Sequence, residues 1–185
     1  MGAGASIEVS DENKVLIEAT KALLGDKAKC AEIWAKVDIN GNGLVSVAEM
    51  DKMIGESSAE WDGFFAPVVD EGTGKPKQPV LIRAWKKATG REYSTHEDGF
   101  IHKHEFKPFV RLIMMYNYLF TVFDELNGDD RRISEEEFVA GVGKLGAGEE
   151  GTDLSQTFKN IDTNGGGQIL FDEFCHYAMC LLDAQ

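Results

Sequence analysis

Cysteine is scarce in this chain of 185 residues: Cys30, Cys175 and Cys180 are odd in number and show no CxxC spacing. This pattern indicates neither a disulfide framework nor a zinc ribbon, and it favours a reducing, intracellular compartment. Long apolar runs are missing too, because Arg111 and Asn117 interrupt the longest one, so no segment is predicted to cross a bilayer. The amino terminus also lacks the basic and apolar regions of a secretory signal.

Basic residues are few beside acidic ones, 19 against 32, which gives a formal net charge of −13 at pH 7. Such a charge repels phosphate backbones, so nucleic acid is not expected as a partner. No nucleophile elbow, paired-carboxylate site or cofactor fingerprint is found, so catalysis is not predicted. Hydrophobic residues make up 43% of the chain, which is enough to bury at least one core.

One pattern is present four times. A branched apolar residue is followed four residues later by glutamate and then by a large apolar residue. When the glutamate is counted as position 12 of a loop, the branched residue stands at position 8. These residues are Val45, Ile101, Ile133 and Ile169 at position 8, and Glu49, Glu105, Glu137 and Glu173 at position 12. The repeat is the strongest feature of the sequence.

The repeat predicts an all-α fold of four helix-loop-helix units in two pairs. Each pair is expected to join its two loops through the residues at position 8. The expected boundaries are 1–9 for a flexible amino terminus, 10–112 for the first pair (units 27–55 and 79–112, insertion 56–79) and 113–185 for the second pair (units 113–143 and 152–183).

Helix signals refine the first half of the chain. A helix capped by Ser10 is expected to end at Gly25, and further helices are expected over 27–37 and 47–54. In the insertion, a capping pair predicts a short helix, and the stretch 70–79, with two prolines and two glycines, is expected to be flexible. The expected inward residues are Val15, Leu16, Ala19 and Leu23 in the first helix and Ile33, Trp34 and Val37 in the second; the capping pair is Ser57 and Glu60.

The first loop, DINGNGLVSVAE (38–49), fills every position that a calcium loop uses. Calcium takes about six to eight hard oxygens, and such a loop supplies them from positions 1, 3, 5, 7, 9 and 12. Gly43 at position 6 permits the sharp turn. Because only two ligands are charged, magnesium is expected to compete. The expected ligands are Asp38, Asn40, Asn42, the Leu44 carbonyl, Ser46 and Glu49.

The fourth loop, 162–173, has fewer side-chain oxygens than the first. Gly166 at position 5 and Leu170 at position 9 bring no side-chain oxygen, so water has to replace them. Three glycines in a row also lose more entropy on ordering. We expect calcium to bind here more weakly. The expected site is formed by Asp162, Asn164, Gly166, the Gln168 carbonyl and Glu173.

The second loop is expected to hold no calcium. Ser94 at position 1 is uncharged, and His96 and His102 stand at positions 3 and 9. With His104 nearby, zinc is an alternative, but HExxH spacing is absent and we favour solvated loop histidines.

The third loop has a conflict of register. Counting back from Glu137 makes Leu126 the first residue, whereas the preceding helix makes Asn127 the first, so one residue is missing. Arg131 and Arg132 are then expected where a ligand and the bend glycine normally stand. We expect that this loop has lost the metal.

Four such units resemble the EF-hand superfamily over nearly everything from Lys27 onward. Within it, the chain resembles calflagins, the flagellar calcium-binding proteins of trypanosomatids, in FTVFDELNGDDRRISEEEF (120–138), in FKNIDTNGGGQILFDEF (158–174) and in its start, MGAGAS. The resemblance implies a paired-hand fold and calcium-dependent behaviour at a ciliary or flagellar membrane.

The amino terminus departs from that family. Calflagins resemble one another in pairing a glycine for myristate with a nearby cysteine for palmitate, and here Gly2 and Ser6 are present without a cysteine. Gly2 is therefore a candidate for a single myristoyl chain, which by itself gives only reversible attachment. A plain disordered tail is the alternative.

An apolar stretch, expected as a helix over roughly 103–126, leaves two functions open. In a calcium sensor such a surface opens toward a partner helix or an acyl chain. In a calcium-stabilised structural protein of a cilium or axoneme it stays buried, and an interdomain core needs the same residues. We favour the sensor, and a pure calcium buffer fits less well. The stretch carries Phe106, Phe109, Leu112, Ile113, Met114, Met115, Tyr116, Tyr118, Leu119 and Phe120.

Overall fold

The computed structural model describes residues 11–90, 96, 98–128, 130–141 and 153–183. The chain forms two compact units, which divide within one helix between Asn117 and Tyr118. Within the described ranges, no helix is both long and apolar enough to cross a membrane. Ser10, Gly2 and Ser94 lie outside these residues.

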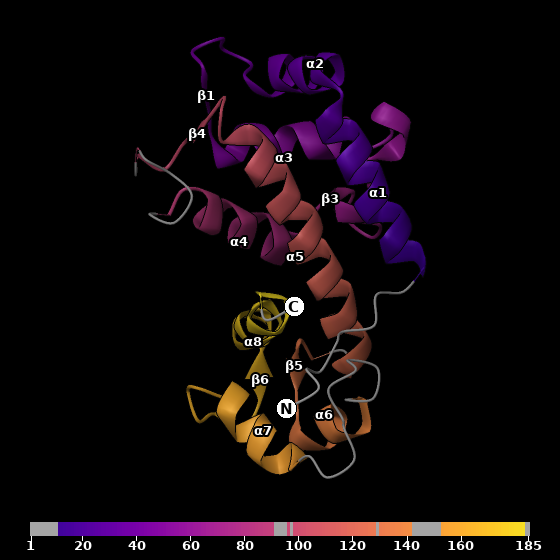
Figure 1. The fold of residues 1–185 in the computed structure, drawn as a ribbon, viewed down its shortest axis with the longest axis vertical. Coiled ribbons are helices and arrows are strands. Elements are labelled where there is room, and N and C mark those ends of the chain that lie inside the picture. Colours follow the sequence, from indigo (N-terminus) through magenta and orange to yellow (C-terminus); the bar gives the residue numbers. More distant parts are fainter. Residues whose placement is uncertain (1–10, 91–95, 97, 129, 142–152, 184–185) are drawn as a thin grey trace. The chain divides into compact units, whose positions relative to one another are not determined.

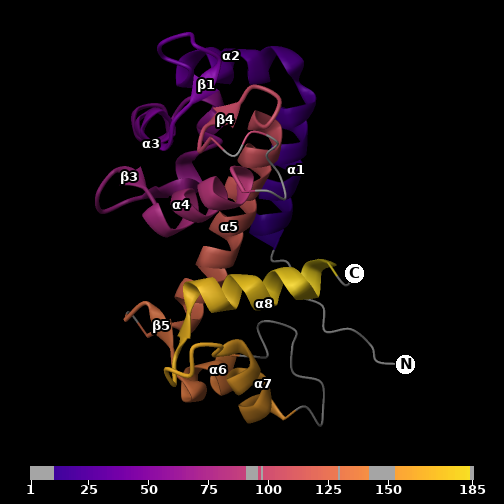
Figure 2. The same cartoon turned by 90° about the vertical axis from the view of Figure 1, so that its left-hand side faces the viewer.

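The amino-terminal unit carries the first two loops and, between them in sequence, a small hairpin over 69–76 (Figure 1). Its helices surround the first part of the long helix α5, and α1 runs beside α5 in both Figure 1 and Figure 2. The elements in chain order are α1 (Asp11–Gly25), α2 (Lys27–Val37), β1 (Leu44–Val45), α3 (Val47–Glu56), the 3-10 turns η1 (Trp61–Gly63) and η2 (Ala66–Val68), β2 (Val69–Asp70), β3 (Lys75–Pro76), α4 (Gln78–Ala88), β4 (Ile101–His102) and α5 (Phe106–Leu126).

Helices α1 and α2 end and begin where the sequence predicts. Gly25 closes α1, and the Asp26 carboxylate caps α2 by accepting hydrogen bonds from two backbone N–H groups. The predicted inward residues of α2 are all buried. In α1, however, the prediction for Val15 and Ala19 was wrong: both are exposed.

The reason is that the burial in α1 lies toward its carboxyl end. Leu23 and Leu24 are buried there, and Lys107 on α5 donates a hydrogen bond to the Leu24 carbonyl. Thr20 is buried as well. Helical spacing predicts which apolar positions of α1 share one face, but it does not predict how much of that face is covered by the neighbouring helices.

The insertion between the first two helix-loop-helix units (56–79) is folded throughout. This differs from the expectation of a short helix followed by a flexible stretch. Two 3-10 turns replace the predicted helix, and Ser57 ends α3 instead of capping a new one. Strands β2 and β3 then pair, and the Asp70 carboxylate accepts hydrogen bonds from the N–H and hydroxyl of Thr73. Because Phe65 and Val68 are completely buried, the insertion contributes to the core of this unit.

The carboxyl-terminal unit begins within α5 and carries the last two loops. Figure 2 shows α6 and α7 side by side and α8 leading away from its short strand. The Asp153 carboxylate caps α7 through the N–H of Gln156. The elements after α5 are β5 (Arg132–Ile133), α6 (Glu135–Gly141), α7 (Leu154–Ile161), β6 (Ile169–Leu170) and α8 (Phe171–Asp183).

The predicted fold class, four helix-loop-helix units in two pairs, is confirmed. Strand β1 pairs with β4 so that Val45 faces Ile101, and β5 pairs with β6 so that Ile133 faces Ile169. Helix α5 belongs to two helix-loop-helix units. It follows the loop of the second and precedes the loop of the third. This sharing explains why one helix carries such a large share of the apolar residues.

Candidate metal centres

Loop I (38–49) is organised around the carboxylate of its first residue. The two oxygens of Asp38 accept hydrogen bonds from the N–H groups of Asn42 and Gly43, each 3.0 Å away. Glycines at positions 4 and 6 make the turn, with φ of 67° and 79° at Gly41 and Gly43. The Asn42 side chain in turn accepts from the N–H of Leu44. These hydrogen bonds fix the backbone of the loop around the Asp38 carboxylate.

Loop IV (162–173) repeats this arrangement with fewer side chains. The Asp162 oxygens accept from the N–H groups of Gly166 and Gly167 at 3.0 and 2.8 Å. Its glycines at positions 4 and 6, Gly165 and Gly167, have φ of 68° and 75°. The two loops therefore share one backbone geometry although only loop I has a full set of side-chain oxygens.

The glutamate at position 12 closes each loop. One of its oxygens, Oε2, accepts a hydrogen bond from the backbone N–H at position 9 in all four loops. The other, Oε1, faces the residue at position 3. In loop I that residue is Asn40, whose side-chain nitrogen lies 3.2 Å from Glu49 Oε1, and in loop IV it is Asn164. Positions 3 and 12 are thus brought together by the fold itself.

The carboxylate of Glu173 is tuned by its surroundings. Burial raises the pKa of Glu173, but hydrogen bonds from the N–H groups of Leu170 and Asn164 and from the side chains of Thr163 and Asn164 together outweigh it. The net result is a pKa below the usual value. The group is therefore held ionised, which is the form that binds a cation.

Loop III (127–137) lacks one residue, and the structure places the gap. Asn127 donates its N–H to the Phe123 carbonyl, as the first residues of loops I and IV do to their own helices. Gly128 donates its N–H to Glu137 Oε1, which is the role of position 3. The missing residue is therefore position 2.

The bend of loop III falls on an arginine. Arg131 has φ of 64°, the left-handed conformation that glycine adopts in the other loops, and it stands at position 6 when counted back from Glu137. The expectation that Arg132 occupies the bend was wrong, because Arg132 lies in β5 opposite Leu170. Its side chain bonds to Gln168 across the two loops. A strained bend and two positive charges make loop III a poor cation site.

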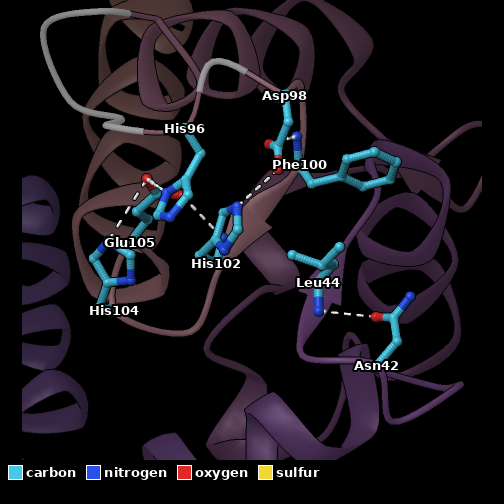
Figure 3. Close-up of polar contacts among 8 residues, drawn as sticks. All are labelled: Asn42, Leu44, His96, Asp98, Phe100, His102, His104 and Glu105. Carbon is cyan, nitrogen blue, oxygen red and sulfur yellow. Dashed lines mark hydrogen bonds and ion pairs between the residues drawn. The ribbon is translucent and has the colours of Figure 1, made fainter.

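Loop II (94–105) brings its histidines together around a buried glutamate, as Figure 3 shows. The Glu105 side chain is 3% exposed, and its Oε1 lies 3.6 Å from His96 Nδ1 and 3.8 Å from His104 Nε2. The His102 ring stacks on His96 with centroids 3.7 Å apart, and its Nε2 lies 2.9 Å from Asp98 Oδ2. The interpretation of solvated loop histidines was therefore incomplete. Their spacing in sequence did not reveal that the loop turns two of them toward one carboxylate.

Loops I and IV fit a hard divalent cation. Their first and last residues are carboxylates, their remaining side-chain donors are amide or hydroxyl oxygens, and the bend glycines have the required φ. Calcium prefers oxygen donors of this kind. Loops II and III do not fit, because loop II presents imidazoles and loop III lacks one residue.

The chain is similar to known flagellar calcium-binding proteins. A family model for an EF-hand domain pair matches residues 116–179. The chain is 30% identical over 160 residues to the flagellar calcium-binding proteins TB-17 and TB-24 of Trypanosoma brucei brucei, covering 83% of this chain and 64% and 68% of those proteins. It is 34% identical over 123 residues to a flagellar calcium-binding protein of Trypanosoma cruzi, covering 63% of this chain and 57% of that protein. The chain thus spans slightly less than two thirds of TB-17.

Proposed function

This chain belongs to the EF-hand family of flagellar calcium-binding proteins, and we propose that within it the chain is a calcium sensor that receives its signal at loops I and IV. Calcium is its cofactor. The ligands we assign are those predicted from the sequence, with Asp38 and Glu49 as the charged pair of loop I and Asp162 and Glu173 as that of loop IV. The observation that supports this assignment is the matching pair of backbone hydrogen bonds to Asp38 and Asp162.

Each calcium loop is coupled to a degraded loop by two paired strands. Loop I is joined to loop II through Val45 and Ile101, and loop IV to loop III through Ile169 and Ile133. A cation that draws the position-12 glutamate toward the loop moves the start of the helix to which that glutamate belongs. In loop I this helix is α3, whose first turn is also capped by Glu49 and Ser46. The signal therefore passes from the ion to a helix.

The receiver of the signal is a protein helix or a membrane surface at a cilium or flagellum. EF-hand sensors commonly hand the signal to a target protein through apolar groups of their helices. The apolar residues of α5 are the source we assign. An acyl group at Gly2 is a second route, because one myristoyl chain gives attachment weak enough to be reversed.

The competing function is a calcium-stabilised structural component of the axoneme. The observation that favours it is burial: Phe109 and Ile113 on α5 are completely covered in the structure. In such a protein calcium raises stability without exposing these residues. The two functions therefore differ in whether calcium changes the exposed apolar surface.

Calorimetric titration tests the site assignment. Glu49→Gln and Glu173→Gln should each remove one calcium ion from the stoichiometry, because each takes away a carboxylate that contributes two oxygens. Glu137→Gln is the matched control, since it makes the same change at position 12 of loop III and should leave the stoichiometry unaltered. Unchanged stoichiometry in both of the first two variants contradicts the assignment.

A dye that fluoresces on apolar surface tests the sensor. The calcium-loaded protein should bind more dye than the calcium-free protein, and the Glu49→Gln/Glu173→Gln double variant should lose that difference. If both loops are loaded and dye binding does not change, the structural role is correct. Partition of the natively processed protein among cytosol, membrane and cytoskeleton, with and without calcium, then separates a membrane receiver from an axonemal one.

A further inference from the structure

Beyond calcium, we propose that loop II is a site for zinc or a similar late first-row divalent metal, held by His96 Nδ1, His104 Nε2 and Glu105 Oε1. One ligand atom from each of these residues lies within 4.8 Å of the other two, and Glu105 Oε1 is 3.6 Å from His96 Nδ1 and 3.8 Å from His104 Nε2. The site is separate from loops I and IV, and it takes a different class of ion. Its donors are two nitrogens and one oxygen, a set that borderline metals prefer and calcium does not.

The geometry of the calcium loop explains how the cluster arises. Positions 3 and 12 face each other in loops I and IV, where an asparagine approaches the glutamate. In loop II the same position 3 is His96, so the fold places an imidazole nitrogen where the other loops place an amide. His104 at position 11 adds a second nitrogen. The loop thus keeps the convergence of an EF-hand and exchanges its hard donors for softer ones.

The distances suit metal binding better than direct contact. The two nitrogen-to-oxygen separations of 3.6 and 3.8 Å exceed those of a hydrogen bond. Ligand atoms around a tetrahedral zinc ion lie about 3.3 Å apart, given metal-ligand bonds of about 2.0–2.1 Å. Both imidazoles have room to move, since the His96 and His104 side chains are 41% and 63% accessible, and small rotations of the two together would draw the three atoms to this spacing. A water molecule would complete four-coordination.

Two surrounding groups hold the cluster in place. Glu105 is anchored through its other oxygen, Oε2, which accepts the N–H of His102 at 2.9 Å. The His102 ring stacks on His96 and is itself fixed by Asp98. A ligand that is oriented by a neighbour in this way costs less entropy to immobilise when the metal binds. We assign His102 and Asp98 as positioning residues.

Zinc titration of calcium-loaded protein tests the proposal. Saturating calcium occupies loops I and IV, so any zinc that then binds reports a different site. One zinc ion per chain is expected, and Co²⁺ should give the visible absorption of a tetrahedral ion with nitrogen and oxygen ligands. Loss of zinc binding on addition of calcium would show that zinc merely enters the calcium loops, and the proposal would fall.

Three variants locate the ion. The double variant His96→Gln/His104→Gln should weaken zinc binding by more than about tenfold, because the loss of an outer-shell partner alone lowers metal affinity by about tenfold or more. Glu105→Gln should weaken it as well. His176→Gln is the matched control, because this exposed histidine on α8 stands in the other unit and should bind zinc like the parent. Circular dichroism and calcium stoichiometry verify that each variant is folded.

The result that overturns the proposal is specific. If the double histidine variant is folded and takes up zinc with the affinity and stoichiometry of the parent, the ion sits elsewhere, for instance on cysteine thiols. Absence of zinc binding by the parent at micromolar free zinc overturns it too.

Discussion

Val45 lies directly opposite Ile101 in the antiparallel β1–β4 pair, and both side chains are completely buried. These two residues join loop I, the loop with the most oxygen donors, to loop II, the loop with the histidine cluster. Ile133 and Ile169 form the equivalent pair in the carboxyl-terminal unit. Each contact is a small piece of core that sets the separation of two loops.

Truncating this contact should affect one unit alone. Ile101→Ala removes a buried side chain and should lower the free energy of unfolding of the amino-terminal unit by about 2–5 kcal/mol, with weaker calcium binding at loop I. Urea unfolding followed by tryptophan fluorescence measures the loss of stability of the amino-terminal unit, because all three tryptophans belong to it: Trp34, Trp61 and Trp85.

The matched control is Ile133→Ala, which makes the same truncation in the other pair. It should destabilise the carboxyl-terminal unit by a similar amount and leave the tryptophan-detected transition in place. If it shifts that transition as much as Ile101→Ala does, the two units unfold together and the prediction is wrong.

Restoring a side-chain oxygen should strengthen loop IV. Gly166→Asn reproduces Asn42 of loop I at position 5 and should tighten calcium binding about three- to tenfold, which corresponds to roughly one added ligand. A Cβ at this position would lie 2.6 Å from Asn164 Oδ1, so the gain requires that the flexible Asn164 side chain shifts while its oxygen stays within reach of the ion.

Gly166→Ala separates the oxygen from the steric effect. It adds the same Cβ without a donor, so calcium affinity should stay the same or fall. Calorimetric titration in a Glu49→Gln background reads loop IV alone. Equal gains in the Asn and Ala variants would contradict a ligand role for position 5.

The bend of loop III should become more stable with glycine. Arg131 adopts φ of 64°, and an L-residue in this conformation costs about 1–2 kcal/mol. Arg131→Gly should therefore stabilise the carboxyl-terminal unit by about 1 kcal/mol, measured by thermal unfolding followed by circular dichroism. Calcium stoichiometry should not change, because position 2 is still missing.

Arg131→Ala is the comparison that isolates the backbone. It removes the same charge and side chain but keeps the strained φ, so it should gain less than the glycine variant. Equal stabilisation by the two variants would assign the effect to charge instead.

The stability of loop III should depend on pH through Glu137. The N–H and then the hydroxyl of Ser134, with a further contribution from the N–H of Gly128, hold the pKa of Glu137 below its usual value. A lowered pKa in the folded state means that the carboxylate stabilises the fold at pH above its unfolded pKa and that this contribution is lost as the pH falls through the folded pKa.

Comparison of the parent with Glu137→Gln checks the sign. Without calcium, the variant should be less stable near pH 7, and the difference should shrink as the medium becomes more acidic than the lowered pKa. Urea unfolding followed by circular dichroism at several pH values measures it, with the exposed neighbour Glu136→Gln as control. A difference that grows in acid would refute the prediction.

The loops were predictable because their chemistry is local. Asp38, Gly43 and Glu49 stand in one twelve-residue stretch, and their spacing alone indicates what the backbone must do. The pairing of Ile133 with Ile169 was predictable for a similar reason, since position 8 carries the same residue type in every repeat. The register conflict in loop III was visible in the sequence, but only the hydrogen bonds of Asn127 and Gly128 place the gap.

Other features depend on residues that are distant in sequence. The insertion at 56–79 has the glycines and prolines of a flexible stretch, yet Phe65 and Val68 are buried, which composition does not reveal. The covered length of α1 likewise depends on α2 and α5, not on its own periodicity. Such outcomes come from packing, in which many weak contacts compete.

By itself the sequence determined the fourfold repeat, the helix boundaries around Gly25 and Asp26, and the two oxygen-rich loops, because turns, caps and loop ligands are set by neighbouring residues. The tertiary structure alone decided that the insertion joins the core and that His96 and His104 meet at the buried Glu105 carboxylate. The physical reason is convergence: a curved loop brings position 3 to position 12 in space, and whether the donors there are oxygens or nitrogens decides which metal suits them.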